Sequence, residues 1–292
     1  MSNHLELLAP AKINLFLHVT GRRPNGYHEL QSVFQLVDWC DRLCFSTIDR
    51  NTIIRHGGNP TIPPEKDLVV RAAQLLKSHT NYPYGVEIHL EKNIPIGAGL
   101  GGGSSDAATV LIALNQLWNL HLPKTELSEL GLQLGADVPF FLFGHNAFVQ
   151  GIGEQLECID LPNQEFLIIF PGQSVSTQTV FQSDRLTRNH APITIIDFLA
   201  NTGDVGQFAN DLQPVACELC PEVNRALNWL AQTLPDATRR MSGSGSSVFA
   251  VLPESIKRYD LEQKMLNLPS GWVGRLVRGL KQNPAYNSVL SV

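Results

Sequence analysis

The strongest chemical signal in the sequence is a glycine-rich segment, G-A-G-L-G-G-G-S-S, that starts at residue 97. Five of the seven residues from 97 to 103 are glycine. Glycine accepts positive φ angles and lets another group approach the backbone closely. The sequence predicts a helix from about Ser104, and free N–H groups at a helix N-terminus attract anions. The segment is therefore a candidate phosphate-binding loop. Its residues are Pro95, Ile96, Gly97, Ala98, Gly99, Leu100, Gly101, Gly102, Gly103, Ser104 and Ser105.

Three common phosphate loops fit this segment poorly. Residues 97–102 match the dinucleotide pattern G-x-G-x-x-G, but Pro95 precedes them and no acidic residue ends a second strand about 20 residues later. A P-loop requires lysine after the last glycine, where this chain has Ser104. The HRD and DFG motifs of protein kinases are absent from the sequence. A tight turn without a ligand is the plain structural alternative, but such a turn needs only one or two glycines.

Lysine and aspartate residues elsewhere in the chain could act on a phosphoryl group. Residues 5–19 alternate as a strand, which places Lys12 and Asn14 on the same face. Asp137 lies in a turn between an amphipathic segment and an apolar run. Phosphoryl transfer to an alcohol needs a group that accepts the proton and a charge that stabilises the transferred group. From residue types alone, Lys12 could equally be an exposed strand residue and Asp137 a turn or cap residue.

The glycine segment, read as P-x-G-x-G-L-G-G-G-S-S, resembles the ATP motif of the GHMP kinases. The length of its glycine run narrows the resemblance to the branch that phosphorylates a cytidine diphosphate-linked methylerythritol. Further segments agree in the order of that branch: PAKINLFLHVTGRRPNGYHEL at 10–30, LGADVPFFL at 134–142, GxGE at 151–154, NDLQPVA at 210–216 and MSGSGSSVFA at 241–250.

The resemblance implies an activity. It is ATP-dependent phosphorylation of the C2 hydroxyl of that substrate, with ADP as the second product, in non-mevalonate isopentenyl diphosphate synthesis. It also implies that Lys12 and Asp137 are the catalytic pair, with Asp137 as the base and Lys12 keeping it ionised. Mg²⁺ accompanies ATP, and Ser104 and Ser105 are its candidate ligands. The nearest alternative is another small-alcohol kinase of the superfamily, similar to homoserine or mevalonate kinase.

Substrate recognition is expected in the segment around residues 25–29. A cytosine ring needs an aromatic platform, which Tyr27 offers, and hydrogen bonds at its polar edge, which His28 can make. The resemblance places Phe181 on the opposite face of the base, and Asn14 and Thr177 at polar parts of the substrate. A lone aromatic residue such as Phe181 could also be an ordinary core residue.

Two other motifs are less informative. Residues 241–247 form a second glycine loop, which similar kinases close over the triphosphate region opposite the first loop. Cys217 and Cys220 form a solitary C-x-x-C, too few ligands for structural zinc, and Pro221 follows them. We interpret these cysteines as buried or partly buried free thiols.

Strands and helices mix along the whole chain without the regular alternation of a βα barrel, which predicts an α+β protein. We expect two lobes, residues 1–150 and 151–292, and the resemblance places both ligand sites in the cleft between them. Expected strands are 5–19, 31–37, 43–46, 85–90, 166–170, 247–252 and 274–280. Expected helices follow Asp67, Ser104, Ser176 and Asp204 and cover 124–134, 222–234 and 255–266.

Composition excludes several classes of protein. The net charge of −5 argues against bulk binding to nucleic acid or to an anionic membrane. The N-terminus lacks the pattern of a signal peptide, and no apolar run is long enough to span a bilayer. We expect a soluble cytoplasmic enzyme that binds two small molecules. A NAD-dependent oxidoreductase and a nucleotide sensor without catalytic activity are rival hypotheses, and the presence of both Lys12 and Asp137 argues against the sensor.

Overall fold

The computed structural model describes residues 4–201 and 206–286. Its strands are β1 (His4–Arg22), β2 (His28–Ile48), β3 (Ile53–Gly57), β4 (Gly85–Glu91), β5 (Ala147–Gln150), β6 (Gln155–Cys158), β7 (Glu165–Phe170), β8 (Arg239–Met241), β9 (Val248–Val251) and β10 (Val273–Arg278). Its helices are α1 (Leu68–Thr80), α2 (Gly102–Leu117), α3 (Lys124–Leu134), α4 (Val138–Phe143), α5 (Thr177–Gln182), α6 (Ile195–Ala200), α7 (Gln213–Leu219), α8 (Pro221–Thr233) and α9 (Arg258–Met265). The α+β prediction is confirmed.

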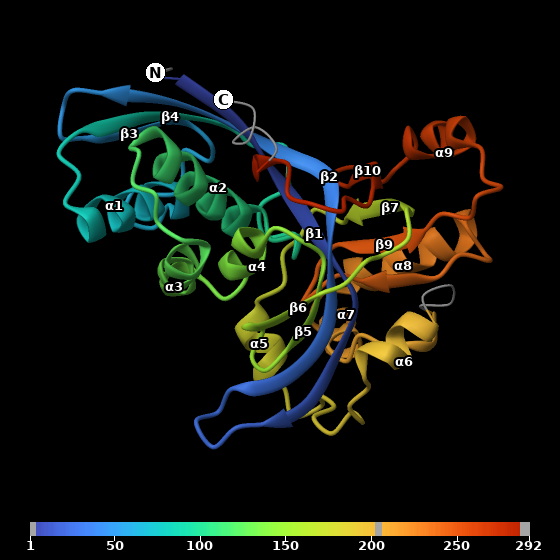
Figure 1. Cartoon of the computed structure of the whole chain (residues 1–292). Coiled ribbons are helices and arrows are strands. Elements are labelled where there is room, and N and C mark those ends of the chain that lie inside the picture. Colours follow the sequence, from blue (N-terminus) through green and yellow to red (C-terminus); the bar gives the residue numbers. More distant parts are fainter. Residues whose placement is uncertain (1–3, 202–205, 287–292) are drawn as a thin grey trace.

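The first sheet has the strand order β3-β4-β2-β5-β6, with β1 paired to β2. Figure 1 shows β1 and β2 as a long antiparallel pair that runs through the molecule, with α1 to α4 gathered beside the first sheet. The sheet also includes β6, which follows residue 150 in the chain and pairs with β5. The inner face of β4 presents Val86, Ile88 and Leu90 to the core, while Glu87 and His89 point outward.

The second sheet has the order β10-β7-β9-β8. It lies on the other side of the β1–β2 pair, together with α8 and α9 (Figure 1). Bridges from Leu17 to Asn210 and from Val37 to Gly279 tie the long pair to this half of the chain. A buried apolar cluster that includes Phe16, Phe166 and Phe249 is shared by strands of both sheets.

Most expected elements are confirmed, with one informative error. The sequence predicts separate strands at 31–37 and 43–46, but β2 is continuous through both. The pairing register shifts between Pro10 and Ala11, opposite residues 37–40 of β2. Asp38 and Asp41 interrupt the apolar–polar alternation of the sequence, which resembles the end of a strand. The bulge lets the strand continue through this interruption. In the other expected elements only the ends differ: α2 begins two residues early, and α9 begins at Arg258 because Lys257 is still extended. The sequence did not predict β3, β5, β6, β8 and α4. The expected helix start at Asp204 lies outside the described residues.

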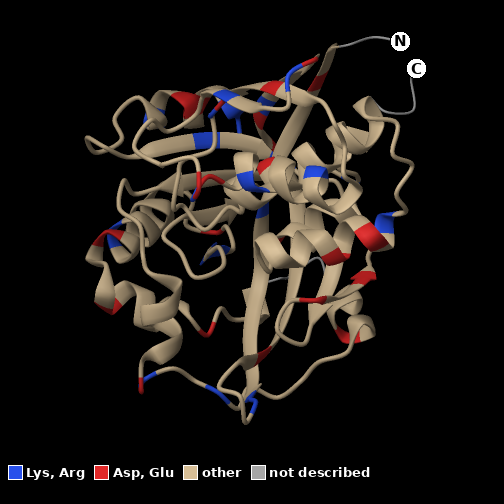
Figure 2. Cartoon of the chain, turned by 90° about the vertical axis from the view of Figure 1, so that its left-hand side faces the viewer, with Lys and Arg blue, Asp and Glu red and all other residues tan. Residues whose placement is uncertain are grey.

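Charged residues of both signs are interspersed over the described fold (Figure 2), which fits the small net charge. Among the described helices, none is both long enough and apolar enough to cross a bilayer. All five cysteines are free, with Cys220 buried and Cys217 partly buried, as the sequence predicts.

Candidate active site

The glycine loop has the backbone that its composition predicts. Gly97, Gly99 and Gly101 adopt φ angles of 70°, 74° and 72°, in the left-handed region that favours glycine. Gly101 is the N-cap of α2, so the free N–H groups of that helix lie at the end of the loop. A hollow of about 350 Å³ lies against the loop and is lined by residues 95–104. Lys92 and Asp106 also line it, and we call it the nucleotide hollow after the ATP that the sequence leads us to expect there.

A second hollow of about 330 Å³ also borders the glycine loop. Residues Gly99, Gly101 and Ser104 line both hollows, so this part of the loop forms a wall that they share. The second one, which we call the acceptor hollow after the alcohol expected there, brings together five of the residues singled out from the sequence: Lys12, Asn14, Asp137, Thr177 and Phe181. Ser105 lines neither hollow, because its side chain is fully buried in α2.

Lys12 and Asp137 face each other in the acceptor hollow, with Lys12 Nζ 3.5 Å from Asp137 Oδ2. The Lys12 side chain is only 5% exposed, so it is not an ordinary surface residue of a strand. Asp137 precedes α4 at the N-cap position, yet its carboxylate accepts no hydrogen bond from that helix. Lys12 is thus not an exposed strand residue, and Asp137 lies in a turn but does not cap α4 with its carboxylate. The Asp137 side chain is 35% exposed, which leaves its carboxylate accessible to a ligand.

Neighbouring side chains hold the Lys12 ammonium in place. Lys12 Nζ donates to Asn14 Oδ1 at 2.7 Å and lies 4.4 Å from the centre of the Phe34 ring. Asn14 Nδ2 in turn donates to Ser32 Oγ at 3.0 Å. The Lys12 backbone N–H donates to the Leu100 carbonyl at 2.9 Å, which joins β1 directly to the glycine loop. The ammonium is therefore positioned before any ligand binds.

The second glycine loop packs against the first. The Ser247 N–H donates to the Ala98 carbonyl at 3.0 Å, and a Cβ on Gly99 would lie 2.4 Å from the Gly245 carbonyl oxygen. Only glycine permits this approach at position 99. Asn210 Nδ2 donates to the carbonyl of Gly243 at 2.8 Å and so fixes the loop from behind. Gly243 and Ser244 line the acceptor hollow.

Of the expected base-recognition residues, His28 contacts Phe181, whereas neither Tyr27 nor His28 lines the acceptor hollow. The His28 ring stacks on Phe181, with ring centres 5.1 Å apart. Tyr27 is 60% exposed, and within the described residues no ring contact joins it to Phe181. Arg188 Nε donates to His28 Nε2 at 3.0 Å. Burial, followed by the charges of Arg188 and Arg22, lowers the pKa of His28. The imidazole is therefore neutral at pH 7 and carries its proton on Nδ1.

Sequence reasoning missed two features of the site. One is Arg188, which lies in a segment without a motif. The other is a buried ionic group under the glycine loop, in which Lys92 Nζ donates to Asp106 Oδ2 at 2.8 Å and to Asp41. Burial raises the pKa of Asp106, against the charge of Lys92. The signal that could have found this group is the position of Asp106 directly after the two serines.

A glycine loop that separates a nucleotide hollow from a lysine–carboxylate pair, on this α+β fold, defines a GHMP-type kinase. The GHMP kinases N terminal domain model matches residues 67–145. A homoserine kinase structure from Cytophaga hutchinsonii has the same fold, with a TM-score of 0.69 at 19% identity, covering 98% of this chain and 97% of its own.

Closer relatives identify the particular family. The chain is 57% identical to a 4-diphosphocytidyl-2-C-methyl-D-erythritol kinase from Polynucleobacter asymbioticus, over 98% of this chain and 97% of the relative. A solved 4-(cytidine 5'-diphospho)-2C-methyl-D-erythritol kinase superimposes with a TM-score of 0.80 at 34% identity, covering 94% of this chain and 99% of its own. The chain belongs to the 4-diphosphocytidyl-2-C-methyl-D-erythritol kinase family.

Proposed function

We propose that this chain transfers the γ-phosphoryl group of ATP to the C2 hydroxyl of 4-diphosphocytidyl-2-C-methyl-D-erythritol. The products are the 2-phosphate and ADP. The observation that carries the proposal is the shared wall of glycine between the nucleotide hollow and the acceptor hollow, with Lys12 and Asp137 on the acceptor side. ATP bound on one side of Gly101 and an alcohol on the other bring donor and acceptor together.

The residues of the chain suffice for the proton and charge changes of this transfer. Asp137 accepts the proton of the C2 hydroxyl while the hydroxyl oxygen bonds to the γ-phosphorus of ATP. The bond from that phosphorus to the ADP oxygen breaks in the same step. Lys12 Nζ, 3.5 Å from Asp137 Oδ2, offsets negative charge on the transferred group. The N–H groups at the start of α2 and the glycine loop hold the phosphates.

Mg²⁺ is the expected metal partner of ATP, and it neutralises phosphate charge when bound. Mg²⁺ prefers oxygen ligands, and Ser104 offers a hydroxyl at the wall between the two hollows. We therefore propose Ser104 rather than Ser105 as the serine ligand, because Ser105 Oγ is buried away from both hollows.

The cytidine part of the substrate is proposed to bind around Phe181. His28 Nδ1–H is a donor for the acceptor atoms of a cytosine edge, since its Nε2 already accepts from Arg188. Tyr27 is proposed as a movable platform, because its exposed ring can close on a bound base. Asn14 and Thr177 are proposed to contact polar groups of the substrate nearer the reacting centre.

We propose that both lobes contribute residues to the active site. Residues 1–150 carry Lys12, the ATP loop and Asp137, and residues 151–292 supply the second glycine loop and part of the substrate site. Both substrates are soluble nucleotide derivatives, so we propose that the enzyme works in the cytoplasm without a nucleic-acid or membrane partner.

Product analysis tests this function. The purified chain is incubated with ATP, Mg²⁺ and the cytidyl substrate, and the products are examined by mass spectrometry and ³¹P NMR. The expected result is one ADP for each phosphomonoester formed, with the new phosphate coupled to C2. Phosphate on another oxygen, or ADP formed without a phosphorylated product, would contradict the proposal.

A further inference from the structure

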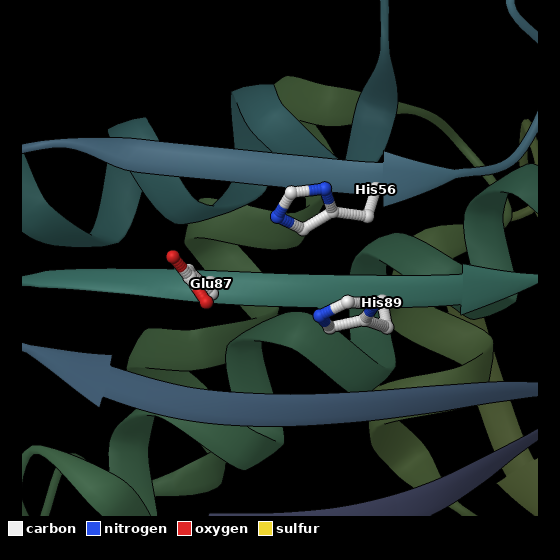
Figure 3. A group of neighbouring side chains, drawn as sticks. All are labelled: His56, Glu87 and His89. Atoms are coloured by element: carbon white, nitrogen blue, oxygen red, sulfur yellow. The ribbon is translucent and has the colours of Figure 1, made fainter.

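Three potential metal ligands, His56, Glu87 and His89, converge on the outer face of the first sheet (Figure 3). One ligand atom from each side chain lies within 4.8 Å of the other two. The group is separate from the active site, since none of the three residues lines the nucleotide hollow or the acceptor hollow. We propose that they form a binding site for a divalent transition metal of the zinc type.

Strand register explains why these residues meet. β3 and β4 are parallel, and His56 is paired directly with His89 across the ladder. Glu87 precedes His89 by two residues on β4, so it points to the same face. The His56 and His89 rings are stacked with centres 4.5 Å apart. In Figure 3 each ring turns a nitrogen toward the side on which Glu87 lies.

The backbone next to His56 is firmly held. A Cβ on Gly57 would lie 2.2 Å from the Leu90 carbonyl oxygen, so β3 approaches β4 at a distance that only glycine allows. The Gly58 N–H also donates to the Leu90 carbonyl at 2.9 Å. These contacts fix His56 opposite His89 and leave the rings themselves free to rotate, because both residues are exposed.

Small rotations are enough to form the site. Zinc binds imidazole nitrogen at about 2.0–2.1 Å, which in a tetrahedral site places ligand atoms roughly 3.4 Å apart. The three ligand atoms, which lie within 4.8 Å of one another, therefore have to approach by at most about 1.4 Å. Among the described residues, none of these three side chains forms a hydrogen bond or an ion pair that would have to be broken.

The donor set selects the class of metal. Two imidazoles and one carboxylate suit zinc and related transition metals, whereas Mg²⁺ and Ca²⁺ prefer oxygen ligands. Three protein ligands leave a fourth position for water. Cys44 lies opposite His89 on β2, but its thiol points to Glu6, with Cys44 Sγ 3.7 Å from Glu6 Oε2. We therefore exclude Cys44 from the ligand set.

Metal binding would link β3, at the edge of the first sheet, to β4. β3 pairs only with β4 in the described sheet, and it leads into the segment that contributes Asn59, Ile62 and Lys66 to the nucleotide hollow. A metal that binds His56 on β3 and His89 on β4 joins the two strands through their side chains. Because it binds the folded chain in preference to the unfolded one, it raises thermal stability.

The test uses the full chain, stripped of metal by a chelator and free of ATP. Zn²⁺ affinity is measured by competition with a chromophoric zinc indicator, and Co²⁺ binding by visible absorption. We expect one site, a higher melting temperature with Zn²⁺, and no competition from Mg²⁺. His56→Ala and His89→Ala should each weaken Zn²⁺ binding by about tenfold or more, since even indirect partners of a metal site cost 10–100-fold. Glu87→Gln should weaken it less.

His79→Ala is the matched control. His79 is another exposed histidine, and its Nε2 lies 2.5 Å from Glu126 Oε1. Within the described part of the chain, this imidazole–carboxylate pair has no third metal ligand beside it. This variant should bind Zn²⁺ like the wild type, and all four variants should keep kinase activity. The proposal is overturned if the wild type binds Zn²⁺ no more tightly than His56→Ala, or if His79→Ala lowers affinity as much as His56→Ala and His89→Ala do.

Discussion

Lys12 Nζ lies 3.5 Å from Asp137 Oδ2, although one residue belongs to the first strand and the other precedes α4. This distance allows ionic attraction while leaving the carboxylate open toward the acceptor hollow. The N–H of Lys12 is bonded to Leu100 of the glycine loop. The pair is thus tied to the loop that separates it from the nucleotide hollow, which links phosphate binding to the reacting centre.

Asp137→Asn removes the proposed base with little change of shape. We expect kcat to fall by about 10²–10⁴-fold, the usual effect of a positioned base. The fold and ATP affinity should stay near those of the wild type, because the Asp137 carboxylate makes no capping hydrogen bond to α4 and does not line the nucleotide hollow. Single-turnover kinetics and calorimetry check both points. A kcat of Asp137→Asn within about threefold of the wild-type value would contradict the role of Asp137 as the base.

Lys12→Met removes the ammonium but keeps most of the volume of the side chain. We expect kcat to fall by about 10²-fold or more, as when one charge-stabilising donor is lost. Asn14 Oδ1 also loses its partner, which costs about 1–3 kcal/mol of folding stability. Steady-state kinetics and thermal unfolding measure the two effects separately. Lower stability with an unchanged kcat would show that Lys12 is a structural residue.

Gly101→Val tests the shared wall. A Cβ at this position would lie 2.9 Å from Phe141 Cζ and 3.2 Å from Lys12 Cγ, and its φ of 72° is strained for valine. The strain and the two close contacts favour a different loop conformation by about 1–2 kcal/mol or more. Because Gly101 lines the nucleotide hollow, this change should lower ATP affinity by about tenfold or more. Calorimetry with ATP measures this loss.

Gly271→Val is the control for Gly101→Val. Gly271 also has a positive φ, of 84°, but a Cβ there meets nothing within 4 Å. It should lower stability without affecting ATP affinity. Equal affinities for ATP in the Gly101→Val variant and the wild type would place the nucleotide elsewhere.

His28→Ala tests recognition of the base. Loss of one neutral hydrogen bond should raise KM for the cytidyl substrate by about two- to tenfold and narrow its advantage over the uridyl analogue. Tyr27→Ala should weaken both analogues alike, because stacking tolerates any base. The cytidyl-to-uridyl ratio of kcat/KM is the decisive readout, since general damage to the Phe181 stack would not change it. An unchanged ratio in His28→Ala assigns base reading to other groups.

Local patterns in the sequence were enough to predict several parts of the site. Alternation along residues 5–19 placed Lys12 and Asn14 together, and the hydrogen bond between their side chains confirms it. The glycine run predicted the loop conformation, because positive φ at alternate positions excludes most other residues. Such features depend only on neighbours in the chain.

Features that depend on strand register or on long-range packing could not be predicted in this way. The group of Lys92, Asp41 and Asp106 joins β2, α2 and the segment after β4. The bulge that lets β2 continue past Asp38 is visible only in its pairing with β1. The convergence of His56 on His89 likewise requires the parallel register of β3 and β4. Alternation tells which face a side chain occupies, but not which residue of the next strand it meets.

The central claim is that the acceptor is the cytidyl-linked alcohol, and coupled measurement of ADP release tests it most directly. The purified chain is supplied with ATP, Mg²⁺ and, in separate assays, the cytidyl substrate, mevalonate or homoserine. We predict that kcat/KM is highest for the cytidyl substrate by several orders of magnitude, and that Asp137→Asn slows this release by about 10²–10⁴-fold. Comparable or faster turnover of mevalonate or homoserine would contradict it.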